Sequence, residues 1–134
     1  NGYRFIKLNT GMTEVLRPSL YGSQHPIHII PEPGQVALRE EVSQVIVGHC
    51  CESGDLLTPA NGDPEALSPR KMIRGEIDDF CVIESVGAYC SSMTAKNYNS
   101  FPEAAEVLRK KDGNLILIRK RQTFEQLIEN EVVQ

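Results

Sequence analysis

The 134-residue sequence predicts a mainly β domain, of the barrel or sandwich type, with a short helix at its C-terminal end. The sheet is predicted by several short runs of apolar, β-branched and aromatic residues, each bounded by Gly, Pro, Asn or Asp. The helix is predicted by Thr123 and Gln126, which have the spacing of a capping box. The length and the hydrophobic content of 40% suit one domain over residues 1–134, with a single modest core.

The first strands are expected in residues 3–8, 27–30 and 42–47. Residues 3–8 already alternate between apolar and polar side chains, and the first residue is Asn1 rather than Met. We therefore expect the sequence to be a piece of a longer protein. Residues 58–75 are rich in Pro, Gly, Asn and charge and show little periodicity, so an exposed loop is expected there.

The second half of the chain is expected to hold a strand in residues 80–86 and then a β-hairpin. The pair Asp112-Gly113 separates residues 106–109 from residues 115–119, and it is a strong turn signal because Gly accepts positive φ. These two runs are therefore predicted to pair as antiparallel strands.

The segments on either side of the hairpin need separate interpretation. Residues 101–106 could begin a helix by propensity, with Pro102 in its first turn. The hairpin signal directly after them favours a loop that enters a strand. Beyond the hairpin, Phe124, Leu127 and Ile128 form one apolar stripe, so a short helix is expected to close the chain.

Composition excludes several classes of partner. The formal charge of −4 and the scatter of Lys and Arg argue against a nucleic-acid surface. No apolar run approaches the roughly 20 residues that a membrane span needs, and no signal segment opens the chain. We therefore expect a cytoplasmic protein without membrane association. The four cysteines are expected to be reduced, because two are adjacent and nothing indicates secretion.

Three segments hold more reactive side chains than a structural β-domain needs: residues 11–21, 48–55 and 87–93. In the first, Arg17 and Tyr21 are candidates for an anion site, because guanidinium and phenol groups both donate hydrogen bonds to carboxylates. The alternative is that both are surface residues on a bent connection.

The second segment places thiols and a carboxylate between a strand and a loop, where a turn can direct side chains into a cleft. The potential metal ligands are His49, Cys50, Cys51, Cys81 and Cys90. They lack the paired-cysteine spacing of structural zinc sites, so no metal site is expected. A buried, unreactive cysteine is the other interpretation of these thiols. In the third segment, the alternative to a site role for Tyr89 is a core or rim position.

Together and in this order, the three segments resemble the C-terminal part of diaminopimelate decarboxylases, which are pyridoxal 5'-phosphate (PLP) enzymes related in fold to alanine racemase. The resemblance extends from about residue 5 to residue 108. It is carried by Leu16-Arg17-Pro18-Ser19-Leu20-Tyr21, Cys51-Glu52-Ser53-Gly54-Asp55, Gly87-Ala88-Tyr89 and Asn97-Tyr98-Asn99-Ser100-Phe101-Pro102. The sequence departs from the pattern at Asn9-Thr10, where many members carry Asp-Ala before Gly-Met.

The resemblance implies a β-barrel-like domain that packs beside a β/α barrel. In the family that barrel carries the Schiff-base lysine and most of the contacts to the PLP phosphate, and this chain lacks it. The cofactor implied for the full-length enzyme is therefore PLP, and the isolated chain is expected to be inactive. The implied reaction converts meso-2,6-diaminopimelate to L-lysine and CO₂, the last step of lysine biosynthesis.

The resemblance also implies a role for each candidate residue. Cys51 is the implied proton donor after decarboxylation, and Glu52 is implied to hold the distal ammonium of the substrate. Both are offered across a homodimer interface to the active site of the partner subunit. Arg17 and Tyr21 are implied to bind the distal carboxylate, and Tyr89 to contact both substrate and cofactor, in the site of their own subunit.

Two alternatives stay open. One is the C-terminal domain of a related PLP-dependent decarboxylase that acts on ornithine, arginine or carboxynorspermidine. Ornithine lacks a distal carboxylate, so Arg17 would face no anion there, whereas meso-diaminopimelate carries both an amine for Glu52 and a carboxylate for Arg17. The other alternative is a non-catalytic β module used for dimerisation.

Overall fold

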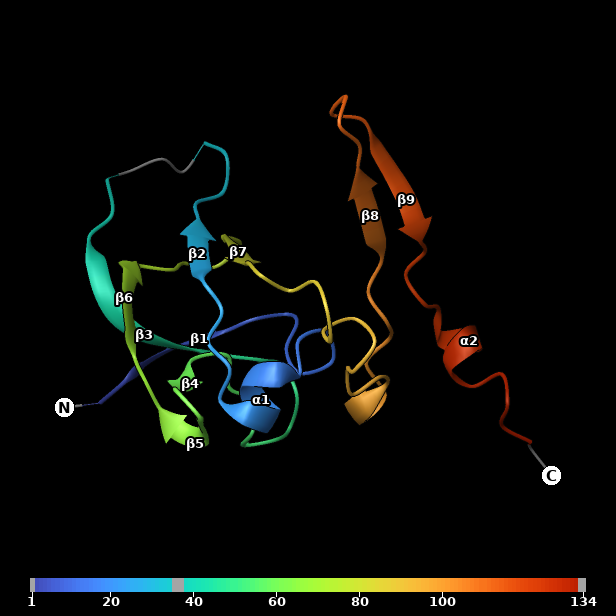
Figure 1. Ribbon diagram of the computed structural model, residues 1–134, viewed down its shortest axis with the longest axis horizontal. Coiled ribbons are helices and arrows are strands. Elements are labelled where there is room, and N and C mark those ends of the chain that lie inside the picture. The colour runs from blue at the N-terminus through green and yellow to red at the C-terminus, as the bar shows by residue number, and fades with distance from the viewer. Residues whose placement is uncertain (1, 35–37, 133–134) are drawn as a thin grey trace.

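The computed structural model describes residues 2–34 and 38–132, and Figure 1 shows them as short strands joined by loops and short helical turns. The strands of the described residues are β1 (Arg4–Lys7), β2 (Ile27–Ile30), β3 (Glu41–Val47), β4 (Pro59–Ala60), β5 (Asp63–Leu67), β6 (Arg70–Ile73), β7 (Phe80–Ile83), β8 (Glu106–Arg109) and β9 (Leu115–Arg119). The helices are α1 (Arg17–Tyr21), the 3-10 helix η1 (Tyr98–Ser100) and α2 (Phe124–Leu127). The prediction of a mainly β chain that ends in a short helix is confirmed.

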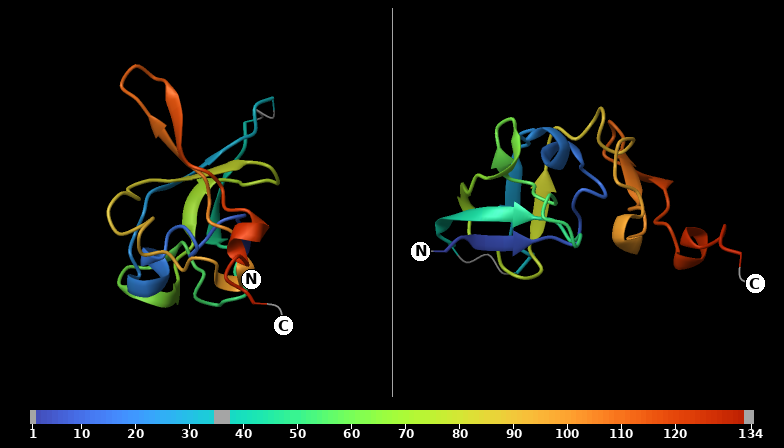
Figure 2. Two further views of the ribbon diagram at one scale, coloured as in Figure 1. Left: turned by 90° about the vertical axis from the view of Figure 1, so that its right-hand side faces the viewer. Right: turned by 90° about the horizontal axis from the view of Figure 1, so that it is seen from below.

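The central sheet has the order β1-β3-β6. β1 runs parallel to β3, with Phe5 opposite Val45, and β6 runs antiparallel to β3. Figure 2 shows β1 and β3 lying side by side. The pairs β2-β7, β4-β5 and β8-β9 form separate two-stranded sheets, and the sheets of the described residues do not close into one continuous barrel.

The core forms where the central sheet meets the β2-β7 pair and the turns after β1 and β3. Val45 and Ile46 are fully buried: both pair with β1 on one edge of β3, and the amide of Leu57 donates to the carbonyl of Ile46 at 3.0 Å. The cluster of buried apolar residues consists of Val15, Ile27, Ile29, Ile46, Leu57, Met72 and Cys90. Val15 follows β1 and Leu57 follows the turn after β3, so the segments that carry the candidate site are fixed to the core.

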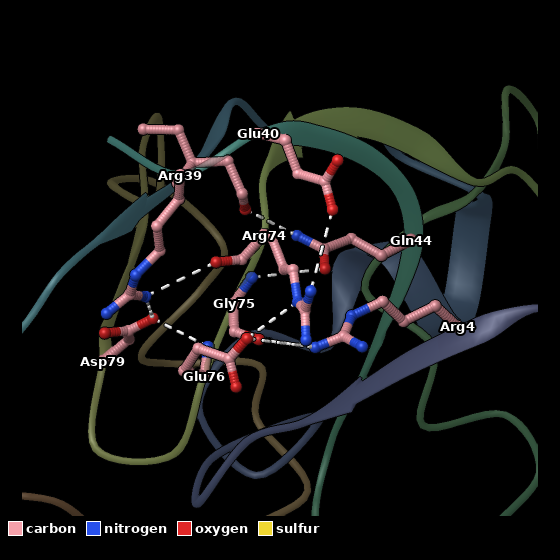
Figure 3. A network of polar contacts seen from close by, with 9 residues as sticks. Arg4, Arg39, Glu40, Gln44, Arg74, Gly75, Glu76 and Asp79 are labelled. Atoms are coloured by element: carbon pink, nitrogen blue, oxygen red, sulfur yellow. Dashed lines mark hydrogen bonds and ion pairs between the residues drawn. The ribbon is translucent and has the colours of Figure 1, made fainter. Parts of the chain in front are cut away.

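A polar network secures the edge of the central sheet (Figure 3). Arg39 forms an ion pair with Asp79, and Arg74 Nε lies 2.8 Å from Glu76 Oε1. Burial by itself would raise the pKa of Asp79, but the hydrogen bonds from Arg39 and from the backbone amides of Glu76 and Glu32 outweigh it and lower that pKa. The segment after β6 is thereby held against the sheet.

Residues 58–75 differ from the expected exposed loop, and that prediction was wrong. They contain β4, β5 and β6, and both Thr58 and Met72 are buried. Low β-propensity and the lack of periodicity concealed these strands, because their pairing partners and the core contact of Met72 override local preference.

The strand expected over residues 80–86 is shorter in the structure. β7 ends at Ile83, where its partner β2 begins, and Ser85 takes φ 59°.

The hairpin β8-β9 and helix α2 project from the rest of the molecule (Figure 1). Gly113 adopts φ 89° at the predicted turn, and the amide of Lys110 donates to the carbonyl of Asn114 at 2.8 Å. The capping box of α2 is complete, because the side chains of Thr123 and Gln126 each accept from the other's backbone N–H. The hairpin, the loop before it and the closing helix were thus predicted correctly from the sequence.

Candidate active site

The turn after β3, residues 48–55, presents Cys51 and Glu52 at its exposed tip. The amide of Gly48 donates to the carbonyl of Asp55 at 2.8 Å, and the amide of Asp55 donates to the carbonyl of Glu52 at 3.1 Å. A β-bridge between Val47 and Leu56 closes the turn at its base. The tip is therefore held in one conformation although it points away from the core.

Asp55 anchors this turn to the segment after β1. Its side chain is 2% exposed, and its two carboxylate oxygens accept the backbone amides of Met12 at 2.8 Å and Cys50 at 2.9 Å. The amide of His49 also donates to the carbonyl of Thr10 at 3.1 Å. A buried carboxylate is tolerated here because backbone donors satisfy both of its oxygens.

The two glycines beside Asp55 are required by its position. A Cβ atom at Gly48 would lie 2.1 Å from the Asp55 carboxylate oxygens, and one at Gly11 would lie 2.4 Å from the nearer oxygen. Any larger residue at either position would displace the carboxylate from the amides it accepts. Gly11 and Gly48 thus serve close approach of the backbone to the Asp55 carboxylate rather than a turn with positive φ.

The Glu52 carboxylate receives three hydrogen bonds. The donors are the amide of Gly54 at 3.0 Å, the Ser53 hydroxyl at 3.3 Å and the Tyr98 hydroxyl at 3.2 Å. The Gly54 amide makes the largest contribution to lowering the pKa of Glu52, and Tyr98 follows. The side chain is exposed and negatively charged at neutral pH, which suits it to bind a cation such as an ammonium group.

The two adjacent cysteines have different environments. Cys51 is exposed, and its amide donates to Asn99 Oδ1 at 2.7 Å. Cys50 is partly buried, and burial followed by the charge of Asp55 raises the pKa of its thiol to about 12. The Cys50 thiol therefore stays protonated and unreactive at neutral pH, which leaves Cys51 as the accessible thiol of the turn.

Arg17 and Tyr21 lie on one short helix, α1, rather than on a bent connection. Pro18 stands in its first turn, where no amide donor is needed, and Gly22 ends it with φ 63°. One turn of helix places the Arg17 guanidinium carbon 5.7 Å from the centroid of the Tyr21 ring. The structure thus brings this pair together, with the Tyr21 side chain 52% exposed.

Tyr89 lies on a turn in the segment that leads from β7 to η1. It is 63% exposed and takes φ 61°, so it is not a core residue. The described non-glycine residues with positive φ are Asp78, Ser85, Tyr89, Asn97, Asn99 and Ser100. All but Asp78 lie between positions 85 and 100. Strained backbone of this kind concentrates where side chains are held for function.

The candidate residues form local groups rather than one enclosed pocket. Cys51 and Glu52 share the turn tip, Arg17 and Tyr21 share α1, and Tyr89 stands on its own turn. A cavity of about 480 Å³ lies elsewhere, lined by residues of β1, β7 and the loop before β7. Sequence reasoning assigned no role to Tyr98 and Asn99, and their motif gave the one signal that the segment mattered.

The described residues contain neither a metal-binding cluster nor a membrane-spanning helix. No group of three or more His, Cys, Asp or Glu residues among residues 2–34 and 38–132 is arranged to hold a metal ion. Over the same residues, no helix has the length and apolar character to cross a membrane.

Comparison with protein families adds a match over residues 1–87 to the pyridoxal-dependent decarboxylase, C-terminal sheet domain. Diaminopimelate decarboxylase of Buchnera aphidicola subsp. Baizongia pistaciae is 39% identical over 134 residues, which are 98% of this chain and 31% of that protein. The enzyme of the same name from Escherichia coli K12 is 35% identical, over 96% of this chain and 30% of that protein. The chain therefore spans about a third of the length of these relatives.

Solved structures show the same similarity. A crystal structure of diaminopimelate decarboxylase superimposes with a TM-score of 0.86 at 36% identity, covering 98% of this chain and 31% of that one. Diaminopimelate decarboxylase from Helicobacter pylori, complexed with L-lysine, superimposes with a TM-score of 0.77 at 34% identity, covering 98% of this chain and 29% of that one. The arrangement of the short sheets is thus shared over nearly the whole chain.

Proposed function

The chain belongs to the pyridoxal-dependent decarboxylases, as their C-terminal sheet domain, and from this premise we propose that the full-length protein converts meso-2,6-diaminopimelate to L-lysine and CO₂. The observation that carries the proposal is the exposed tip of the 48–55 turn, where an ionised Glu52 stands beside an accessible Cys51. Relatives that match over 98% of the chain bear the name diaminopimelate decarboxylase, which supports this substrate over other amino acids.

The exposed residues of this chain are suited to contact PLP, and another part of the protein would bind the cofactor. Tyr89, Cys51 and Glu52 are exposed and free to meet a cofactor carried by another part of the protein. The chain spans 31% of a relative's length, which supports a second part that holds PLP through a lysine. When bound, PLP supplies an electron sink for the electrons left by departing CO₂.

Side chains of opposite charge in this chain would bind the two charged groups at the distal end of the substrate. The Glu52 carboxylate would bind the distal ammonium of the substrate, and Arg17 with Tyr21 would bind the distal carboxylate. The cation–π contact between Arg17 and Tyr21 supports this pairing, because it orients the guanidinium before the substrate arrives. Tyr89 would contact substrate and cofactor from its exposed turn.

Cys51 would hold the proton that returns to the substrate carbon after CO₂ leaves. A thiol is suited to this step when it is accessible and aimed at the reacting atom. The exposed side chain and the held backbone of Cys51 support this role, whereas the neighbouring Cys50 is partly buried.

We further propose that the protein is a homodimer in which Cys51 and Glu52 serve the active site of the partner subunit. Their exposure at a tip that points away from the core supports this arrangement. The four cysteines are free, which supports the proposal of a cytoplasmic, reducing compartment.

The test is decarboxylation of meso-diaminopimelate by the full-length protein with PLP. We expect Arg17→Ala to lower kcat/KM by a factor that corresponds to about 2–5 kcal/mol, because a charge-assisted contact to the distal carboxylate is lost. Lys71→Ala, at an exposed position of β6 outside the candidate groups and outside the hairpin, is the control and should keep wild-type efficiency.

Two outcomes would contradict the proposal. If Arg17→Ala and wild type had equal kcat/KM, Arg17 would not be the residue that binds the distal carboxylate. Faster CO₂ release from ornithine than from meso-diaminopimelate would assign a different substrate.

The present chain alone, mixed with PLP, should release no CO₂ above background, because it would lack the lysine that holds the cofactor.

A further inference from the structure

We propose that Tyr98, Asn99 and Phe101, here called the 98–101 clamp, position Cys51 and Glu52 for the reaction. The inference rests on the proposed function of those two residues and extends it to a segment to which no role has been assigned. Three consecutive contacts carry it, each between one residue of the clamp and one residue of the 48–55 turn.

The first two contacts reach the reactive residues directly. Asn99 Oδ1 accepts the backbone amide of Cys51 at 2.7 Å, which fixes the peptide that carries the thiol. The Tyr98 hydroxyl donates to Glu52 Oε2 at 3.2 Å, on the carboxylate oxygen that Ser53 and Gly54 leave open. Asn99 therefore holds the backbone that carries the thiol, and Tyr98 orients the Glu52 carboxylate.

The third contact holds the turn at His49, the residue that precedes the two cysteines. The His49 and Phe101 rings stack with centroids 3.5 Å apart and planes 5° from parallel. His49 Nε2 lies 2.8 Å from Thr13 Oγ1, and that hydroxyl donates to Glu14 Oε2 at 2.6 Å. Because the Thr13 proton is committed to Glu14, His49 must be the donor in its contact with Thr13. The ring is thus fixed at its edge and on its face.

The clamp itself is anchored independently of the turn. Asn97 Nδ2 donates to the Phe101 carbonyl at 3.0 Å and to Gln122 Oε1 at 2.5 Å, which ties the segment to the chain after β9. Asn97, Asn99 and Ser100 take φ values of 58°, 52° and 62°. Asn readily adopts such φ values, and the two hydrogen bonds of Asn97 hold the segment in this conformation without help from the 48–55 turn.

The positive φ of Asn99 makes a clean substitution possible. Asn99→Gly removes the acceptor while keeping a residue that favours φ 52°. Asn99→Asp keeps both the acceptor oxygen and the tolerance of positive φ. Ser100→Gly is the matched control, because it truncates the adjacent exposed residue at the same kind of φ, and no hydrogen bond of the Ser100 hydroxyl occurs in the described part of the chain.

The kinetic arm uses the full-length protein with meso-diaminopimelate and PLP. We expect Asn99→Gly to lower kcat roughly 10–100-fold with little change in KM, because the thiol is misplaced after the substrate binds. Asn99→Asp should restore most of kcat, and Ser100→Gly should match wild type. Equal kcat for Asn99→Gly and Ser100→Gly would overturn the proposal.

Tyr98→Phe separates the second contact from the first. It keeps the ring and removes the hydroxyl, so Glu52 loses one of its three donors. We expect KM to rise about tenfold, with kcat within about twofold of wild type. A drop in kcat at unchanged KM would contradict the assignment of Tyr98 to Glu52, and equal thermal unfolding of the variants would exclude a general loss of stability.

A measurement without activity separates this inference from the proposed function. Hydrogen–deuterium exchange of peptides that cover residues 48–56 reports on the Cys51 amide in the full-length protein. We expect faster exchange in Asn99→Gly than in Asn99→Asp or Ser100→Gly. If wild type fails to decarboxylate meso-diaminopimelate, the proposed function falls, and the exchange data still decide the clamp: unchanged exchange in Asn99→Gly overturns it.

Discussion

At the scale of single residues, the two adjacent cysteines differ more than their shared position on the turn suggests. Both follow the same buried strand, and neither can be distinguished by residue type. The difference arises from Asp55, whose carboxylate accepts the Cys50 amide and whose charge opposes ionisation of the Cys50 thiol. Accessibility and charge environment therefore make Cys51 the more accessible thiol of the pair and keep the Cys50 thiol protonated.

This contrast predicts selective alkylation. Iodoacetamide at pH 8 should label Cys51 first, because it is exposed, whereas the Cys50 pKa of about 12 leaves almost no thiolate there. A raised pKa means that Cys50 ionises only as the pH rises towards about 12, so its labelling should increase only in strong alkali. Mass spectrometry of Cys51→Ser and Cys50→Ser checks this: the first should lose the fast label and the second should keep it. The opposite pattern would be contrary to this assignment.

The buried carboxylate of Asp55 predicts a large cost of substitution. Asp55→Asn replaces one acceptor oxygen with a donor that faces a backbone N–H, so the free energy of unfolding should fall by about 2–4 kcal/mol. Asp63→Asn is the control. Asp63 also accepts two backbone amides, but it is exposed and uses one oxygen, which Asn retains, so the cost should stay below about 1 kcal/mol. Urea denaturation of both variants measures the difference, and equal costs would refute the anchoring role.

At the scale of elements, local signals predicted well where local chemistry decides the structure. The Asp112-Gly113 turn and the Thr123 capping box depend on neighbours within a few residues, and both are found. β5 could not be predicted in this way. Its Asp63 and Pro64 disfavour strands, and it exists because β4 supplies its partner. Helix α1 is five residues long and was hidden by the expectation of a bend at Pro18.

The candidate site follows the same rule. The thiols and the carboxylate of the 48–55 turn stand out from the sequence as local chemistry, and the choice of Cys51 over Cys50 came from the family resemblance. The contacts of Glu52 with Tyr98 and of Cys51 with Asn99 span more than 45 positions, and no periodicity reports them. Long-range contacts of this kind depend on the packing of the whole chain and need a structure.

The capping box of α2 predicts a local effect. Thr123→Ala removes the side-chain acceptor for the Gln126 amide and should destabilise the helix by about 1 kcal/mol, whereas Thr123→Ser keeps the hydroxyl and should cost little. Because α2 buries none of its residues, the global unfolding transition should hardly move. Hydrogen exchange of the Gln126 and Leu127 amides should accelerate in the Ala variant alone. Acceleration in both variants would argue against the cap.

At the scale of the whole molecule, the apolar surface is unevenly distributed. The β8-β9 hairpin exposes Val107, Leu108, Leu115, Ile116, Leu117 and Ile118, and Phe124 of α2 adds to this surface. Figure 2 shows the hairpin standing clear of the other sheets. Exposed apolar surface of this extent is unusual for a free-standing domain and favours burial against another surface.

This surface predicts that the isolated chain self-associates as its concentration rises. The double variant Leu115→Lys and Leu117→Lys places two charges on one strand face and should shift the chain towards monomer in sedimentation velocity. The matched control is Leu38→Lys with Ile77→Lys, which adds the same charge at two exposed residues outside the hairpin and should leave association unchanged. Equal shifts in both variants would assign the effect to net charge.

The buried position of Asp55 beneath an open tip has a consequence for how such a turn can acquire new specificity. Gly11, Gly48 and Asp55 fix the backbone, while the side chains of Cys51, Glu52 and Ser53 contribute little to the core. Randomising Ser53 together with Glu52 in a selection experiment should therefore yield many folded variants with altered substrate choice. The same library built at Gly48 and Asp55 should yield few that survive expression.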